Sequence, residues 1–331
     1  MRQQVERIFA WEYVTAGGMR KYLPSASLIA EGAMMVRALA RDLAAVPGVM
    51  PVVARDAAIP LDPIAGLVEE IGDDDPWPAW EEIVRQCDGV WPIAPESDGI
   101  LAGLSARARE LGRFVLASRE DALAITASKQ ATADHLARCG IRTCPTFPLD
   151  DPPKGAGKGW VVKPDDGVGA GDTHLIEDEA GLDFWREARG GAGFVLQPFL
   201  NGPALSLSLL AQEGVGWLLS CNRQYVEVVH GAFRFDGVTT SGAEERRADL
   251  APLARRIAAS LPGLWGYVGV DLIDTRSGPI VLEINPRLTT SYVGLKESLG
   301  LNVAGLVLSL REHELAALLR PLSPRPVEIR V

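Results

Sequence analysis

The pattern of strands changes once along this 331-residue chain, and that change limits the folds it can adopt. Before about residue 120, short apolar segments alternate with helical patterns. The clearest helical pattern covers 25–45, where apolar residues recur at helical spacing and Pro47–Gly48 follows as a stop. We expect strands at 5–10, 50–55, 89–93 and 114–118. Alternation with short connections predicts a parallel sheet covered by helices.

After about residue 120 the strand patterns alternate in polarity and are separated by glycine-bearing turns. The stretch 196–235 contains several such patterns, which predict antiparallel hairpins. A further hairpin is expected from a strand at 267–273, a turn at Ser277–Gly278 and a strand at 280–284. The chain therefore combines an α/β part with an α+β part.

Composition and charge narrow the classes of function. The chain is 47% hydrophobic and 23% charged, which is typical of globular proteins. Its net charge of −10 argues against nucleic acid or an anionic membrane as a partner. The N-terminal segment has no signal-peptide core, and no apolar stretch is long enough to span a bilayer. Four cysteines form no CxxC pair, so we expect reduced thiols in a cytoplasmic protein: Cys87, Cys139, Cys144 and Cys221.

The segment VLEINPRLTTSY, residues 281–292, places polar side chains at the end of an apolar strand. Glu283 and Asn285 are two residues apart, so they project from the same face. Neighbouring strands of a hairpin lie about 5 Å apart, which brings Asp271 near both of them. Carboxylate and amide oxygens suit Mg²⁺, whose shell phosphate oxygens and water complete. The hairpin therefore predicts a magnesium site that works with a phosphate donor.

A glycine-rich stretch supplies a candidate phosphate contact. In WVVKPDDGVGAGDTHLI, residues 160–176, a strand ends in Lys163, and Gly167, Gly169 and Gly171 follow. The pattern is neither a Walker motif nor a dinucleotide fingerprint. It fits either a loop whose backbone N–H groups approach phosphate or a flexible hairpin. Lys129 begins an amphipathic helix, and taken alone it fits a solvated surface lysine.

The order of these parts resembles the ATP-grasp superfamily of carboxylate–amine ligases, over about residues 115–310. The resemblance implies an ATP-grasp fold, in which two α+β subdomains clasp ATP behind a Rossmann-like parallel-sheet domain. The expected divisions are 1–120 for the N-terminal domain, 121–195 for the central subdomain with the glycine loop, and 196–331 for the C-terminal subdomain with the metal site.

The resemblance also implies roles for single residues. Lys129 and Lys163 would hold the ATP phosphates, and the loop of Gly167, Gly169 and Gly171 would close over them. Adenine would contact Gln197, the Pro198 carbonyl and the Leu200 amide. The metal ligands would be Asp271, Glu283 and Asn285, binding Mg²⁺ or, in its place, Mn²⁺, and Arg287 would face the transferred phosphoryl group. One position departs from the pattern, because Ala204 stands where relatives often carry a ribose-binding Glu.

Three N-terminal stretches, 8–18, 23–35 and 88–101, resemble the subgroup that joins glutamate to tyramine. This resemblance implies an amide formed through an acyl phosphate, between the γ-carboxyl of glutamate and the amine of tyrosine or tyramine. The product would serve the biosynthesis of methanofuran- or methylofuran-type coenzymes. Partners would be small molecules, and a homodimer is compatible with this scheme. Candidate residues of the acceptor pocket are Glu12, Ser25, Glu96, Arg223, Tyr225 and His230.

Two other functions stay open at this point. A dipeptide or D-alanine–D-alanine ligase would share every ATP-site residue, although Gly269 stands where D-alanine ligases carry an arginine. A non-catalytic nucleotide-binding protein would have no need for the set of Asp271, Glu283, Asn285 and Arg287. Some pocket candidates also have structural interpretations: Glu12 and Glu96 fit turn caps, and His230 fits a surface hairpin.

Overall fold

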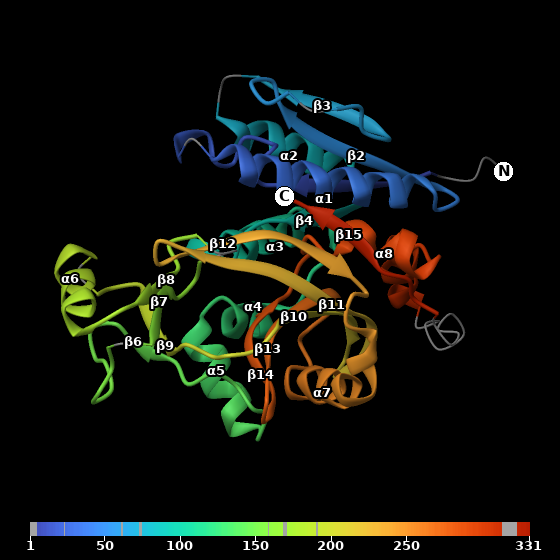
Figure 1. Cartoon of the computed structure of the whole chain (residues 1–331). Coiled ribbons are helices and arrows are strands. Elements are labelled where there is room, and N and C mark those ends of the chain that lie inside the picture. Colours follow the sequence, from blue (N-terminus) through green and yellow to red (C-terminus); the bar gives the residue numbers. More distant parts are fainter. Residues whose placement is uncertain are drawn as a thin grey trace.

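The computed structural model of the chain describes all residues except 1–4, 23, 61, 73–74, 158, 168–170, 190 and 313–322. Two sheets form its framework, and Figure 1 shows one above the other. The first third of the chain builds a parallel sheet, and the remainder builds an antiparallel one. The change of pattern in the sequence therefore corresponds to a change of sheet type.

Parallel strands form the N-terminal sheet, in the order β3-β2-β1-β4-β5. Four of them confirm expected strands, whereas β3 lies at the sheet edge with four exposed residues and so lacks an apolar pattern. The bounds are β1 (Glu6–Glu12), β2 (Val49–Asp56), β3 (Leu67–Ile71), β4 (Gly89–Ile93) and β5 (Phe114–Val115).

Three helices connect these strands: α1 (Ala26–Ala44), α2 (Pro76–Gln86) and α3 (Ile100–Glu110). Helix α1 begins where the sequence predicts, because the Ser25 hydroxyl accepts a hydrogen bond from the Leu28 N–H at 3.2 Å. Such a cap satisfies one of the free N–H groups of the first turn. The parallel sheet with its connecting helices is the expected α/β part.

The described strands of the second sheet follow the order β14-β13-β10-β11-β12-β8-β7-β9-β6, with β15 beside β12. Antiparallel hairpins join β10 to β11, β11 to β12 and β13 to β14, as the sequence predicts. Its strands are β6 (Phe147–Pro148), β7 (Trp160–Pro164), β8 (His174–Ile176), β9 (Phe194–Pro198), β10 (Ala204–Gln212), β11 (Val215–Val229), β12 (Ala232–Thr240), β13 (Gly266–Thr275), β14 (Gly278–Asn285) and β15 (Val327–Arg330). Four helices accompany it: α4 (Glu120–Thr126), α5 (Lys129–Arg138), α6 (Glu179–Arg189) and α7 (Arg247–Ser260).

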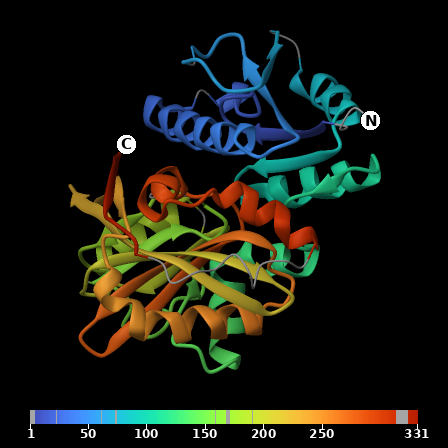
Figure 2. The same cartoon turned by 90° about the vertical axis from the view of Figure 1, so that its right-hand side faces the viewer.

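The last described helices connect the two parts. Helices α8 (Tyr292–Leu299) and α9 (Val303–Ser309) pack against α1, and Figures 1 and 2 both show α8 next to it. Their apolar side chains share one buried cluster, which includes Leu39, Leu43, Tyr292, Leu295 and Val307. The segment just before α8 is thereby held against the N-terminal domain. This packing brings α1 to the edge of the cavity described below.

Among the described residues, no single helix is long and apolar enough to cross a membrane. The pair Tyr292–Leu299 and Val303–Glu312 reaches the required length and composition only jointly, and it is bent by 97°.

Candidate active site

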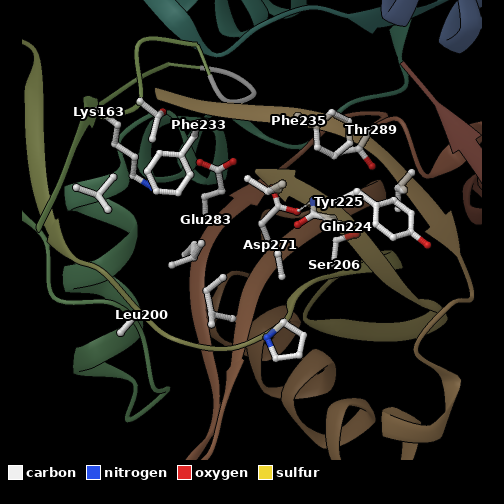
Figure 3. A pocket seen from close by; sticks show the side chains of 18 of the residues that line it. Lys163, Leu200, Ser206, Gln224, Tyr225, Phe233, Phe235, Asp271, Glu283 and Thr289 are labelled. Atoms are coloured by element: carbon white, nitrogen blue, oxygen red, sulfur yellow. Dashed lines mark hydrogen bonds between the residues drawn. The ribbon is translucent and has the colours of Figure 1, made fainter. Parts of the chain in front are cut away.

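A cavity of about 640 Å³ opens between the two ends of the antiparallel sheet. Its lining comes from β7, β9, β10, β11, β12, β13 and β14, from the start of α5, from α1 and from residues 287–291. Figure 3 shows Lys163 and Leu200 on one side, and Tyr225, Phe235 and Thr289 on the other. Asp271 and Glu283 lie between them. The cavity thus has two ends and an acidic middle.

The acidic middle is built by the β13–β14 hairpin. Asp271 pairs directly with Glu283 across the strands, and Gly269 pairs with Asn285, so the predicted proximity is confirmed. The Asn285 side-chain amide donates to Asp271 Oδ2 at 3.0 Å. Gln224, from β11, donates to Asp271 Oδ1 at 2.8 Å. Both donors to this carboxylate are neutral amides.

Two carboxylates facing each other in a buried site shift one another's titration. Burial, and then the charge of Glu283, raise the pKa of Asp271 to about 8. Burial also opposes ionisation of Glu283, but Lys129 and Lys163 outweigh it and lower the pKa of that carboxyl. Near neutral pH, Glu283 therefore carries the negative charge of the pair.

Both lysines point into the cavity near this pair. Lys129 is the first residue of α5 and is buried, so it is not the solvated surface lysine that its sequence alone allows. Its Nζ lies 3.4 Å from Glu283 Oε2 and donates to the Gly167 carbonyl at 2.6 Å. Lys163, at the end of β7, is also buried, and burial lowers its pKa. The two cations and the acids form one charged group.

The residues present fit a magnesium ion bound to phosphate. Asp271, Glu283 and the Asn285 amide oxygen supply the hard ligands that Mg²⁺ prefers. Mutual repulsion of the two carboxylates, seen in the raised pKa of Asp271, is the kind that a divalent cation removes. Lys129 and Lys163 add positive charge for the phosphate oxygens.

Arg287 links this group to the N-terminal domain. Its Nε donates to Glu96 Oε2 at 3.0 Å, and the two side chains are only 12% and 7% exposed. Burial raises the pKa of Glu96, while the neighbouring Arg287 opposes that rise. Glu96, predicted as a pocket residue, thus lies just after β4 and holds the guanidinium in place.

The predicted adenine contacts line the opposite end. Gln197, Pro198 and Leu200 all border the cavity beside Phe199. The Gln197 side-chain amide donates to Thr146 Oγ1 at 2.8 Å, which fixes its orientation. The predicted glycine loop is described only in part. The Gly167 carbonyl accepts a hydrogen bond from Lys129, and Gly171 lies in an exposed turn. Gly169 lies outside the described residues.

Of the six predicted acceptor-pocket residues, two line the cavity, and the other four, including Glu96, lie outside its lining. Arg223 and Tyr225 line the cavity. Ser25 caps α1, and the buried Glu12 accepts hydrogen bonds from Val14 and Thr15, so both have structural contacts outside the lining. His230 is exposed in the β11–β12 turn with φ of 50°, in agreement with its surface interpretation.

Several lining residues have no motif that announces them: Glu31, Gln224, Phe233, Phe235 and Thr290. Glu31 carries a weak signal, because it follows Leu28 by three residues and precedes Met35 by four. It is therefore an acid on the apolar stripe of α1. The other four lie on strands or in the segment before α8, where only the packing decides what they face.

Two domain families match the sequence. The ATP-grasp domain matches residues 126–291, which contain both lysines, the acids and Arg287. The pre-ATP-grasp domain matches residues 49–123. The matched ranges thus cover the cavity lining except Glu31, and most of the parallel-sheet part.

Individual relatives agree with these matches. The tyramine–L-glutamate ligase of Methanocaldococcus fervens is 27% identical over 293 residues, covering 87% of this chain and 89% of the relative. An ATP-grasp superfamily protein of Archaeoglobus fulgidus shares the fold with a TM-score of 0.71 and 23% identity, over 98% of this chain and 92% of that one. The biotin carboxylase domain of the Hydrogenobacter thermophilus 2-oxoglutarate carboxylase was solved with MgADP. It has a TM-score of 0.68 at 15% identity, over 93% of this chain and 70% of that one.

Proposed function

The chain belongs to the ATP-grasp family of ATP-dependent ligases, and we propose that it joins the γ-carboxyl of glutamate to the amine of tyramine or tyrosine. One observation carries the proposal. Asp271, Glu283, Asn285 and Arg287 meet Lys129 and Lys163 in a single cavity. A protein that only binds nucleotide needs no buried arginine beyond the metal ligands. The choice of substrates rests on the relative from Methanocaldococcus fervens.

In the first step, a carboxylate oxygen of glutamate attacks the γ-phosphorus of ATP, and the bond to the β-bridging oxygen breaks. The products are γ-glutamyl phosphate and ADP. Lys129 and Lys163 hold the phosphates, and Arg287 stabilises the charge that develops on the transferred group. Bound Mg²⁺, held by Asp271, Glu283 and Asn285, would neutralise phosphate charge.

In the second step, the neutral amine attacks the acyl carbon. The C–N bond forms, the C–O bond to phosphate breaks, and the amine nitrogen loses a proton. Water must stay away from the acyl phosphate, which it would hydrolyse. Phe199, Phe233 and Phe235 add apolar surface to the cavity in which the acyl phosphate would form.

The remaining parts of the proposal follow from the resemblance in sequence. The amide would enter a methanofuran- or methylofuran-type coenzyme, and an enzyme that consumes ATP would work in the cytoplasm. Mg²⁺ would be the hard cation, and the same oxygen ligands would also accept Mn²⁺. The divisions at 120 and 195 are proposed as the limits of the three folding units, and a homodimer is compatible with them.

An isotope experiment tests this function. Glutamate labelled with ¹⁸O in the γ-carboxyl should transfer one labelled oxygen to inorganic phosphate when ATP and tyramine or tyrosine are present. Controls without amine, and with D-alanine in place of both substrates, separate this activity from that of a dipeptide ligase. Release of unlabelled phosphate during amide formation would exclude the acyl phosphate.

A further inference from the structure

Glu31 is an acid in the cavity that the ATP and metal chemistry does not use. Four acids line the cavity, and two of them, Asp271 and Glu283, belong to the proposed metal site. Glu227 pairs with Arg234 on the exposed hairpin at 3.0 Å. For Glu31, the described residues place no lysine or arginine nitrogen within the 4.0 Å of an ion pair. Its carboxylate therefore lines the cavity without an ion pair to the described residues, although the charge of Arg287 acts on it.

A neighbouring hydroxyl fixes the direction of this carboxylate. Thr290 donates a hydrogen bond to Glu31 Oε1. Thr290 is only 5% exposed and lies directly before α8, so its position is set by the packing of α8 on α1. A carboxylate has about four acceptor sites, and this bond occupies one of them. Oε2 is left to accept from a ligand that carries several N–H donors, such as an ammonium group.

The wall on this side of the cavity is aromatic. Figure 3 shows Tyr225 and Phe235 close to Thr289, away from Lys163 and Leu200. The Tyr225 hydroxyl is bonded to Thr239 Oγ1 at 2.8 Å, so its ring is held in place. An acid on the same side of the cavity as these two rings fits a ligand with a cationic end and a flat apolar end.

The position of Arg287 identifies the substrate that meets Glu31. Arg287 lies three residues before Thr290, and its charge interacts with that of Glu31. The acyl phosphate would form against Arg287, with ADP on the side of Lys163. The amine adds to a face of the acyl carbonyl group before phosphate leaves, and the side of Thr289 (Figure 3) and Thr290, where Glu31 lies, is the side away from ADP.

We propose that Glu31 binds the ammonium group of the acceptor, and that Tyr225 and Phe235 accept its ring, so that the acceptor is an arylalkyl primary amine. This inference rests on the proposed function and names the specificity of its second step. The charge of Glu31 holds the amine beside the acyl carbon until a proton is lost and attack follows. Arg287 and the metal ligands carry out the first step without it.

The test compares wild type with Glu31→Gln, which keeps an oxygen for Thr290 and removes the charge. The substrate is tyramine or tyrosine, whichever gives turnover. KM for the amine should rise roughly 10- to 100-fold, because the variant loses one charge-assisted hydrogen bond to the ammonium group. KM for glutamate and for ATP should stay within about twofold. Hydroxylamine, which is uncharged at neutral pH and has no ring, should trap γ-glutamyl phosphate equally well in both proteins. Glu110→Gln, on the exposed face of α3, serves as the matched control.

The outcomes separate the inference from the function on which it rests. If wild type forms no hydroxamate from glutamate, the proposed function fails. If hydroxamate forms but Glu31→Gln leaves the amine KM unchanged, or raises the KM for glutamate instead, the assignment of Glu31 is overturned. For the ring, wild type should use phenethylamine at least roughly tenfold better in kcat/KM than n-butylamine. Equal use of the two amines would overturn the aromatic part.

Discussion

Two acids of this protein have opposite surroundings. Asp42, on α1, is 1% exposed and lies between two cations: Lys296 Nζ and Arg41 Nε are each 3.1 Å from its Oδ1. The Tyr292 hydroxyl donates to its other oxygen at 3.3 Å. Asp271, in the cavity, receives two neutral amide donors and faces the carboxylate of Glu283.

The difference separates an acid that stabilises the fold from one that serves the site. A buried acid with cations beside it has its charge compensated within the chain. A partly buried acid opposite another acid costs free energy of folding, and this cost appears as the raised pKa of Asp271. A ligand that brings positive charge removes the cost. Each variant below tests one side of this contrast.

The largest effect is expected at Glu283. Glu283→Gln should lower turnover by roughly 10³-fold or more, because it removes a metal ligand and the partner of Lys129. Its melting temperature should change little, because Asp271 can ionise once the charge of Glu283 is gone and can then compensate the buried lysines. ADP release across a magnesium titration, together with calorimetry, measures both. Full activity with an unchanged magnesium requirement would end the metal assignment.

The next effect distinguishes Arg287 from Lys163. Arg287→Ala should lower kcat by about 10²- to 10³-fold while the Kd for ATP changes little, because its charge acts on the group in transfer. Lys163→Ala should lower kcat and also weaken the binding of ATP, since this lysine would already contact phosphate in the ground state. Isothermal titration and steady-state kinetics give the two values.

Arg287→Ala also leaves Glu96 buried without its ion-pair partner, so the loss of turnover needs a control for folding. The double variant with Glu96→Gln keeps the pocket neutral and serves as the control for folding. If it folds and retains normal turnover, Arg287 has no role in phosphoryl transfer.

At Asp42 the effect should fall on stability instead. Asp42→Asn keeps the shape and loses the charge that Lys296 and Arg41 compensate, so unfolding free energy should drop by about 1–3 kcal/mol. Turnover per folded molecule should be unchanged. Urea denaturation and activity at low temperature measure the two quantities. A loss of turnover at full stability would contradict the contrast with Asp271.

The sequence predicts the acidic hairpin because its logic is local. Alternation in 267–284 sets two strands and the short turn pairs them, which brings Asp271 near Glu283. A bulge between Asp271 and Leu272 then places the two acids directly opposite each other, and alternation alone does not show this bulge. The parallel sheet was predictable for the same reason, except for its exposed edge strand β3. Lys129 differs, since its own helix fits a surface residue and only the resemblance to a family assigned it to the site.

What could not be predicted depends on contacts between distant segments. Glu31 and Thr290 are 259 residues apart, and they meet because α8 packs on α1. Periodicity marks Glu31 as an acid on an apolar stripe but does not show what it faces. Ser25 shows the reverse error: it lies close to Glu31 in the sequence, yet its hydroxyl caps α1 and is outside the cavity lining.

The smallest effect concerns Glu12, which is buried. Its carboxylate accepts hydrogen bonds from backbone N–H groups, and the described structure places no cation beside it. Burial raises its pKa above 4.5 despite the hydrogen bonds from Thr15 and Val14. As pH rises past 4.5, the Glu12 carboxyl therefore ionises first in the unfolded chain. The contribution of Glu12 to the stability of wild type should fall until the pH passes its folded pKa.

Glu12→Gln removes this titration but adds a fixed cost, because its new N–H₂ group meets the donors of Thr15. The free energy of unfolding at a single pH therefore does not test the prediction. The slope of that free energy against pH does. Between pH 4.5 and 8, urea denaturation of the variant should show less loss of stability with rising pH than wild type. Equal slopes in wild type and Glu12→Gln would mean that Glu12 titrates alike in folded and unfolded chains. The cost of an uncompensated acid would then not extend beyond the cavity.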